Sequence, residues 1–141
     1  MKAMTGPRVV FTAGVFDLLH RGHINLLWRA RQLGDVLVVG VVSDAGTRAY
    51  KGRTPVQDAD LRMRNVSALR FVDIVELQAT TDPTPLLERY RPDVMVHGDD
   101  WVRLREGHET LERLGIEWIT LPYTPDVSTT ILRRAMSGDA A

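Results

Sequence analysis

Short apolar stretches alternate along the chain with segments whose apolar residues recur at helical spacing. The run Val9 to Phe11 ends near Gly14, residues 23–33 carry apolar side chains three and four positions apart, and Gly34 precedes a continuous apolar run from Val36 to Val42. This order predicts a strand, a loop, a helix and a second strand. Because the second run is apolar at every position, its strand should be covered on both faces.

The alternation continues to the end of the chain. Gly46, Gly52 and Pro55 indicate a loop over residues 43–58, which is followed by a helix over 60–70 and a strand over 73–77. The remaining pattern predicts helices at 83–90, at 104–114 and from about 128, with strands at 94–97 and 116–121. The sequence therefore predicts a single Rossmann-like α/β domain, with a parallel sheet of about five strands flanked by helices and right-handed crossovers.

Length and composition narrow the class of protein. The chain has 141 residues, 18 basic and 18 acidic side chains, and no cysteine. We expect one domain over residues 8–137, with flexible termini at 1–7 and 138–141. The balanced charge argues against broad binding to nucleic acid, and no stretch of about 18 apolar residues predicts a membrane span. We therefore expect a cytoplasmic protein without thiolate chemistry.

Ligands in such sheets bind beyond the carboxyl ends of the strands, so the segments there hold the candidate chemistry. The first is "AGVFDLLHRGH", in which Gly14 allows a tight turn and His20 and His23 flank Gly22 at the start of a helix. Free amides at a helix start attract phosphate, and two imidazoles beside them can donate hydrogen bonds to phosphoryl oxygens. The same spacing also fits a capped helix with incidental histidines or a metal pair. The absence of G-x-G-x-x-G disfavours a dinucleotide fold.

Basic residues follow the second strand. Lys51 and Arg53 flank Gly52 in the predicted loop, where a lysine can neutralise a triphosphate or simply be solvated. Arg62 and Arg64 open the next helix, and one of them can point toward the ligand edge while the other faces solvent.

Polar segments follow the last two strands. "HGDDW" begins at His97, and its carboxylates Asp99 and Asp100 fit either nucleotide binding, a magnesium ion carried by phosphates, or an ordinary polar turn. "VSTT" places hydroxyls at the start of the last helix, where they can cap it or face a ligand.

Together, "GVFDLLHRGH", "YKG", "HGDDW" and "VSTT" resemble the cytidylyltransferase family of nucleotidyltransferases, over Val9 to Met136. The resemblance is greatest to the glycerol-3-phosphate and ethanolamine-phosphate cytidylyltransferases. It implies that a phosphate oxygen of an acceptor attacks the α-phosphorus of CTP, that pyrophosphate leaves, and that a CDP-alcohol forms. It also implies Mg²⁺ with the triphosphate and a homodimer.

The resemblance assigns roles by matching position. His20, His23 and Lys51 would be catalytic, and Asp99 or Asp100 would contact the metal. The residues that would bind the nucleotide are Gly14, Val15, Phe16, His20, Gly22, His23, Arg62, His97, Gly98, Asp99, Asp100, Ser128, Thr129 and Thr130.

The sequence departs from the family pattern in two places. Tyr123 stands where the glycerol- and choline-phosphate enzymes have an arginine, so a bidentate phosphate contact is lost. Residues 43–64 also resemble relatives that make ADP-heptose, although those have "GGD" in place of "HGDDW". We therefore predict transfer of CMP from CTP to a small phosphorylated or phosphonylated alcohol such as glycerol-3-phosphate. The alternatives are transfer of AMP from ATP to a sugar phosphate such as heptose-1-phosphate, and a nucleotide-binding module without turnover.

Overall fold

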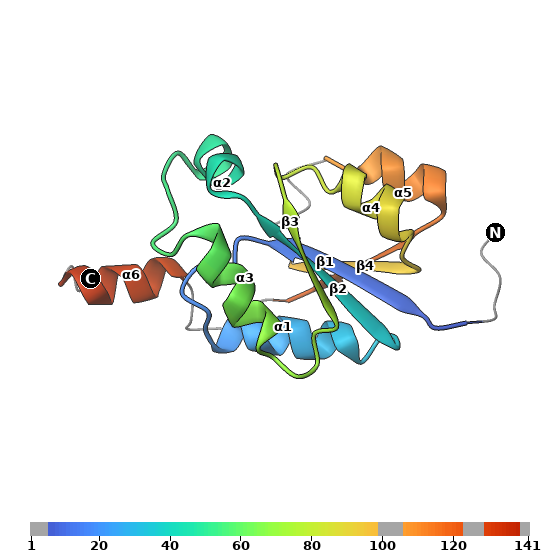
Figure 1. Cartoon of the computed structure of the whole chain (residues 1–141), viewed down its shortest axis with the longest axis horizontal. Coiled ribbons are helices and arrows are strands. Elements are labelled where there is room, and N and C mark those ends of the chain that lie inside the picture. Colours follow the sequence, from blue (N-terminus) through green and yellow to red (C-terminus); the bar gives the residue numbers. More distant parts are fainter. Residues whose placement is uncertain (1–5, 99–105, 123–128, 139–141) are drawn as a thin grey trace.

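The computed structural model describes residues 6–98, 106–122 and 129–138. Five parallel strands form one sheet in the order β3-β2-β1-β4-β5 (Figure 1). The strands are β1 (Val9–Gly14), β2 (Val36–Val42), β3 (Ile74–Gln78), β4 (Val94–Gly98) and β5 (Glu117–Leu121). The helices are α1 (Arg21–Arg31), α2 (Asp44–Lys51), α3 (Ala59–Ser67), α4 (Thr84–Tyr90), α5 (His108–Leu114) and α6 (Thr129–Ser137). The predicted Rossmann-like class with a five-stranded parallel sheet is confirmed.

A hydrophobic core lies on each face of the sheet. On one face, Leu27 of α1 and Val66 of α3 pack against Val10, Val39 and other strand residues. On the other face, helices α4 and α5 cover a second cluster, which contains Phe11, Val38, Leu87, Met95 and Leu111. The central strands are buried on both sides, which explains why they read as continuous apolar runs.

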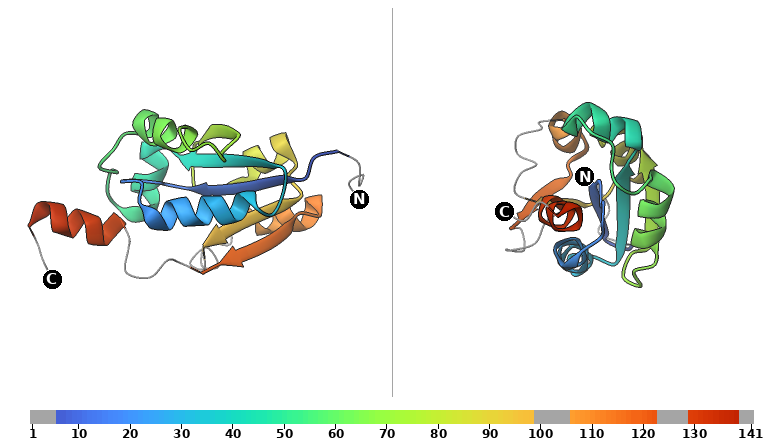
Figure 2. Two further views of the ribbon diagram at one scale, coloured as in Figure 1. Left: turned by 90° about the horizontal axis from the view of Figure 1, so that it is seen from below. Right: turned by 90° about the vertical axis from the view of Figure 1, so that its left-hand side faces the viewer.

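The order of the strands places the ligand edge. From β1 the chain proceeds outward through β2 to β3, then returns to the opposite side of β1 to form β4 and β5. The direction therefore changes between β1 and β4, and the crevice at their carboxyl ends is where ligands bind in such sheets. Helix α6 projects beyond this same edge (Figure 2).

The predicted loop over residues 43–58 is wrong in its first half, which forms α2. Ser43 caps this helix by accepting a hydrogen bond from the Gly46 amide at 3.0 Å, and Gly52 ends it with φ of 76°. Gly46 does not break the helix. A Cβ at this position would lie 2.6 Å from the carbonyl oxygen of Ala79, so the glycine permits close packing on the β3–α4 loop.

Other boundaries shift by a few residues. Helix α1 starts at Arg21 rather than residue 23, because His20 caps it. Within the described residues α5 starts at His108, whereas the predicted helix began at Leu104, which lies outside them. Most of the predicted flexible termini also lies outside the described residues. In the described part of the chain, no helix is long and apolar enough to span a membrane.

Candidate active site

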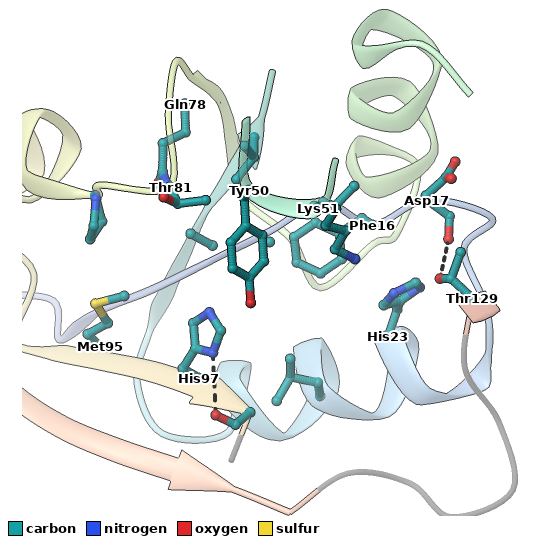
Figure 3. A pocket seen from close by; sticks show the side chains of 17 residues that line it. Phe16, Asp17, His23, Tyr50, Lys51, Gln78, Thr81, Met95, His97 and Thr129 are labelled. Carbon is teal, nitrogen blue, oxygen red and sulfur yellow. Dashed lines mark hydrogen bonds between the residues drawn. The ribbon is translucent and has the colours of Figure 1, made fainter. Parts of the chain in front are cut away.

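A pocket opens at the carboxyl edge of the sheet, above β1 and β4 (Figure 3). Its walls come from the β1–α1 loop, α1, the end of α2, the ends of β3 and β4, and the start of α6. Its lining residues are Ala13, Gly14, Val15, Phe16, Asp17, His23, Leu26, Val42, Tyr50, Lys51, Gln78, Thr81, Pro83, Met95, His97, Gly98 and Thr129. The pocket therefore collects segments that are far apart in the sequence.

Two histidines together form the cap of α1. The Nδ1 atom of His20 accepts a hydrogen bond from the Gly22 amide at 3.0 Å, and Nδ1 of His23 accepts one from the His20 amide at 3.2 Å. This reciprocal arrangement is a capping box in which imidazoles replace the usual hydroxyl and carboxamide groups. The two rings stack with their centroids 3.8 Å apart. Capping therefore fixes the position of both side chains.

The cap also fixes where the ring protons lie. A ring nitrogen that accepts a hydrogen bond carries no proton, so each neutral imidazole has its N–H at Nε2. Burial lowers the pKa of His20. Burial first, and then the neighbouring charges of His20 and Lys51, together lower the pKa of His23 from 6.5 to about 3. Both rings are therefore neutral near pH 7, and each presents an Nε2–H donor to its surroundings.

The β1–α1 loop that leads to these histidines has unusual backbone geometry. Phe16 and Leu18 both have positive φ, 55° and 51°, which is unfavourable for residues with side chains. The ring of Phe16 is 3% exposed and contacts His23 edge to face, with centroids 5.4 Å apart. Packing of Phe16 thus holds the loop in a conformation that its backbone alone would not favour.

Asp17 ties this loop to the segment between α2 and α3. Its carboxylate accepts hydrogen bonds from the amides of Val56 and Gln57 at 2.8 and 2.9 Å. Its main-chain carbonyl accepts one from the hydroxyl of Thr129 at 2.8 Å (Figure 3). Asp17 therefore joins three elements of the pocket wall.

Arg62 is not among the residues that line the pocket. Its side chain is fully buried and donates to the carbonyls of Val15 and Val42, both at 2.8 Å, and to the carbonyl of Gln57 at 2.9 Å. It also pairs with the carboxylate of Asp44 at 2.6 Å. Since these contacts enclose the guanidinium, Arg62 positions the β1–α1 loop and the start of α2 in this structure.

The sequence profile described as Cytidylyltransferase-like matches residues 11–135. The chain belongs to the cytidylyltransferase-like family. A bifunctional protein HldE from Alcanivorax borkumensis is 42% identical over 127 residues, which are 89% of this chain and 27% of that relative. An HldE from Rhodopseudomonas palustris is 41% identical over 138 residues, covering 96% of this chain and 28% of the relative. This cytidylyltransferase-like chain thus spans about a quarter of the curated relatives that it matches.

Solved structures show the same family fold. The crystal structure of a lipopolysaccharide core biosynthesis protein from Thermoplasma volcanium matches with a TM-score of 0.69 and 32% identity. The match covers 84% of this chain and 98% of that protein. The family resemblance found in the sequence is therefore confirmed.

Most of the site residues predicted from the family motifs come together. Those that line this one pocket together are Gly14, Val15, Phe16, His23, Lys51, His97, Gly98 and Thr129. His20 and Gly22 adjoin it through the helix cap, whereas Thr130 is exposed on α6 and is absent from the pocket wall. Asp99, Asp100 and Ser128 lie outside the described residues.

Lys51 is placed differently from the sequence prediction. It is the last residue of α2 rather than part of a loop, and its side chain borders the same pocket as His23. Tyr50 precedes it, and its ring lies between Gln78 and His23 in Figure 3.

Several pocket residues were missed by sequence reasoning. Asp17 lay within the quoted motif, but no spacing rule indicated that its carboxylate joins two loops. Gln78 ends a strand whose carboxyl end was not considered, although the topology rule applies to every strand of the sheet. Gln78, Thr81 and Pro83 become part of the site only because β3 ends at the same edge as β1.

The described residues contain no cluster of three or more acidic or histidine side chains that could hold a metal ion. The carboxylate of Asp17 already accepts hydrogen bonds from two main-chain amides. Asp99 and Asp100 are outside the described part, so a magnesium contact there stays a prediction.

Proposed function

We propose that this chain transfers AMP from ATP to a phosphate oxygen of a sugar phosphate, with release of pyrophosphate. The observation that carries the proposal is the stacked pair His20 and His23, each with its N–H at Nε2, beside a pocket that Lys51 also lines. Two neutral donors and one cation suit a reaction in which negative charge moves among phosphate oxygens.

In the proposed reaction, an oxygen of the acceptor phosphate forms a bond to the α-phosphorus of ATP. The bond from that phosphorus to the oxygen of the departing pyrophosphate breaks, and its electron pair leaves with pyrophosphate. The Nε2–H groups would donate to oxygens whose charge grows during this exchange, while Lys51 would draw the phosphates of both substrates together. No protein nucleophile is needed, because positioning and charge neutralisation suffice.

Two lines of support favour ATP and a sugar phosphate over CTP and a small alcohol phosphate. The curated relatives are HldE proteins with about 40% identity, and residues 43–64 resemble the adenylyl-transferring branch. The solved relative is described as a lipopolysaccharide core biosynthesis protein, and such a core is built of sugars.

A second candidate is transfer of CMP from CTP to a phosphorylated alcohol. The observation that favours it is the segment "HGDDW", which matches the cytidylyl-transferring members at the end of β4. In this candidate the imidazole pair and Lys51 keep their roles, and only the base and the acceptor differ. The homodimer and the magnesium requirement are common to both candidates and stay predictions.

Pyrophosphate release tests both candidates. The protein would be incubated with Mg²⁺, each of four nucleoside triphosphates and a panel containing heptose-1-phosphate, other sugar phosphates, glycerol-3-phosphate and ethanolamine phosphate. We expect release with ATP and a sugar phosphate. Release only with CTP and an alcohol phosphate would select the second candidate, and no release with any pair would reject both.

A matched pair of variants ties the activity to this pocket. Lys51→Met removes the cation that lines it, whereas Arg48→Met removes an exposed cation of the same helix that lies outside it. We expect the first to reduce kcat/KM by about 100-fold and the second to change it less than about twofold. Equal effects would show that the charge of α2, and not the position of Lys51, matters.

A further inference from the structure

We propose that the amide oxygen of Gln78 accepts a hydrogen bond from a hydroxyl group of the acceptor, and that this contact selects polyhydroxylated phosphates over short alcohol phosphates. The inference deepens the proposed function and rests on it. It adds a specificity-determining residue on the side of Tyr50 opposite His23.

Gln78 is a buried polar residue whose amide oxygen accepts no hydrogen bond from the described residues. It is the last residue of β3 and is 3% exposed, yet it lines the pocket. Its Nε2 donates to the carbonyl of Thr80 at 2.9 Å, which fixes the direction of the amide plane. Within the described part of the chain, no donor lies within hydrogen-bonding distance of its Oε1.

The neighbouring strand leaves space for this oxygen. A Cβ at Gly40 of β2 would lie 2.8 Å from Oε1 of Gln78 and 3.2 Å from the ring of Phe11. The absence of a side chain at Gly40 therefore allows the amide to lie over the sheet, among apolar groups. An acceptor enclosed in this way is unfavourable until a donor reaches it. Because Gln78 lines the pocket, a ligand bound there is the group that would bring such a donor.

The position of Gln78 indicates which substrate supplies the donor. In the sheet order, β3 lies two strands from β1, about 10 Å at ordinary strand spacing, whereas β4 lies on the opposite side of β1. Gly98 and Thr129, which the family resemblance assigns to the nucleotide, line the pocket from β4 and α6. The β3 end is therefore left for the acceptor.

In Figure 3, Tyr50 projects between Gln78 and His23. Gln78 and Thr81 lie on one side of Tyr50 together with Met95 and His97 of β4, while His23 and Thr129 lie on the other. An acceptor whose phosphate lies at His23 must extend past Tyr50 to reach Gln78. A sugar ring with several hydroxyl groups has that reach and carries the donor, whereas a two- or three-carbon chain is shorter and has fewer hydroxyl groups to offer.

The test compares Gln78→Met with Gln32→Met in the full chain. Methionine keeps the length of the side chain and removes both the acceptor and the Nε2 donor to the carbonyl of Thr80. Gln32 is an exposed residue at the end of α1 that serves as the matched control. With ATP and the sugar phosphate, we expect Gln78→Met to raise the KM of the acceptor by about tenfold or more. The KM of ATP and the Tm should stay close to those of the unmodified protein.

Acceptors that each lack one hydroxyl group identify the contact. One of them should be poor for the unmodified protein yet no worse than the parent sugar phosphate for Gln78→Met. The inference is overturned if Gln78→Met leaves the acceptor KM unchanged, if it raises the KM of ATP instead, or if it lowers Tm and both kcat/KM values together. Absence of activity with every sugar phosphate in the unmodified protein would reject the proposed function itself, which separates that failure from failure of the inference.

Discussion

The two ends of the pocket differ in how completely their polar groups are satisfied by the protein. At the β1 end, His20, His23, Asp17 and Arg62 each make hydrogen bonds to the main chain. At the β3 end, Gln78 keeps an amide oxygen without a partner among the described residues. Under the proposed function, the end with His20 and His23 is organised before substrate binds, whereas the end with Gln78 is completed by the substrate.

Removal of Arg62 should have the largest effect on the free energy of unfolding. Arg62→Leu leaves the carbonyls of Val15 and Val42 and the carboxylate of Asp44 without their donor, so we expect the free energy of unfolding to fall by about 3 kcal/mol or more. Arg64, two residues along the same helix, forms an exposed pair with Asp60, and Arg64→Leu should cost less than about 0.5 kcal/mol. Urea unfolding measures both. By contrast, Gln78→Met should leave stability nearly unchanged, and an equal loss there would contradict the comparison.

Removal of His23 separates catalysis from helix capping. His23→Ala should lower kcat/KM by about 100-fold through loss of a fixed donor, and lower the free energy of unfolding by about 1 kcal/mol through loss of the capping box. His23→Gln keeps an acceptor at the third helical position, so its stability should be close to normal while its activity stays low. Steady-state kinetics and thermal unfolding of both variants decide the matter. A fully active glutamine variant would show that capping alone accounts for this histidine.

The lowered pKa of His23 predicts a pH dependence of stability. Because its folded-state pKa of about 3 lies below the ordinary 6.5, the unfolded chain binds more protons between these values. The contribution of His23 to the free energy of unfolding is then at its full value above about pH 6.5 and decreases as the pH is lowered toward 3. The slope from this group is up to about 1.4 kcal/mol per pH unit.

Unfolding measurements between pH 5 and 6.5 check this slope, since most carboxylates remain ionised in that range. The difference between the unmodified protein and His23→Gln isolates the contribution of the imidazole. Parallel curves for the two proteins would argue against a buried neutral ring.

The smallest effect concerns backbone strain at the β1 end. Asparagine tolerates positive φ better than leucine, so Leu18→Asn should raise the free energy of unfolding by about 0.5 kcal/mol. Leu19, the next residue, packs against the core, and Leu19→Asn should instead be destabilising. Chemical denaturation of the two variants compares them. Destabilisation by both would mean that side-chain packing outweighs strain at Leu18.

Much of this architecture could be predicted from the sequence, because buried parallel strands leave continuous apolar runs such as Val36–Val42. The meeting of His23, Lys51 and Thr129 followed from the rule that ligands bind at the carboxyl edge of the sheet. Helix α2 was missed because Gly46 reads as a breaker, when its role is close packing against Ala79. The buried role of Arg62 could not be predicted, since helical spacing alone does not separate it from Arg64. Gln78 was missed because the carboxyl end of β3 was not considered as part of the site, although it lies at the same edge of the sheet as the end of β1.

The hydrogen bonds at Nδ1 have a consequence for the substrates that this pocket accepts. With Nδ1 occupied by the main chain and Nε2 already protonated, neither His20 nor His23 can act as a general base without breaking the cap of α1. A free alcohol or amine would need such a base before attacking phosphorus. A phosphate monoester, whose second ionisation lies near pH 6, arrives already deprotonated, so the dependence of rate on pH should follow the ionisation of the acceptor.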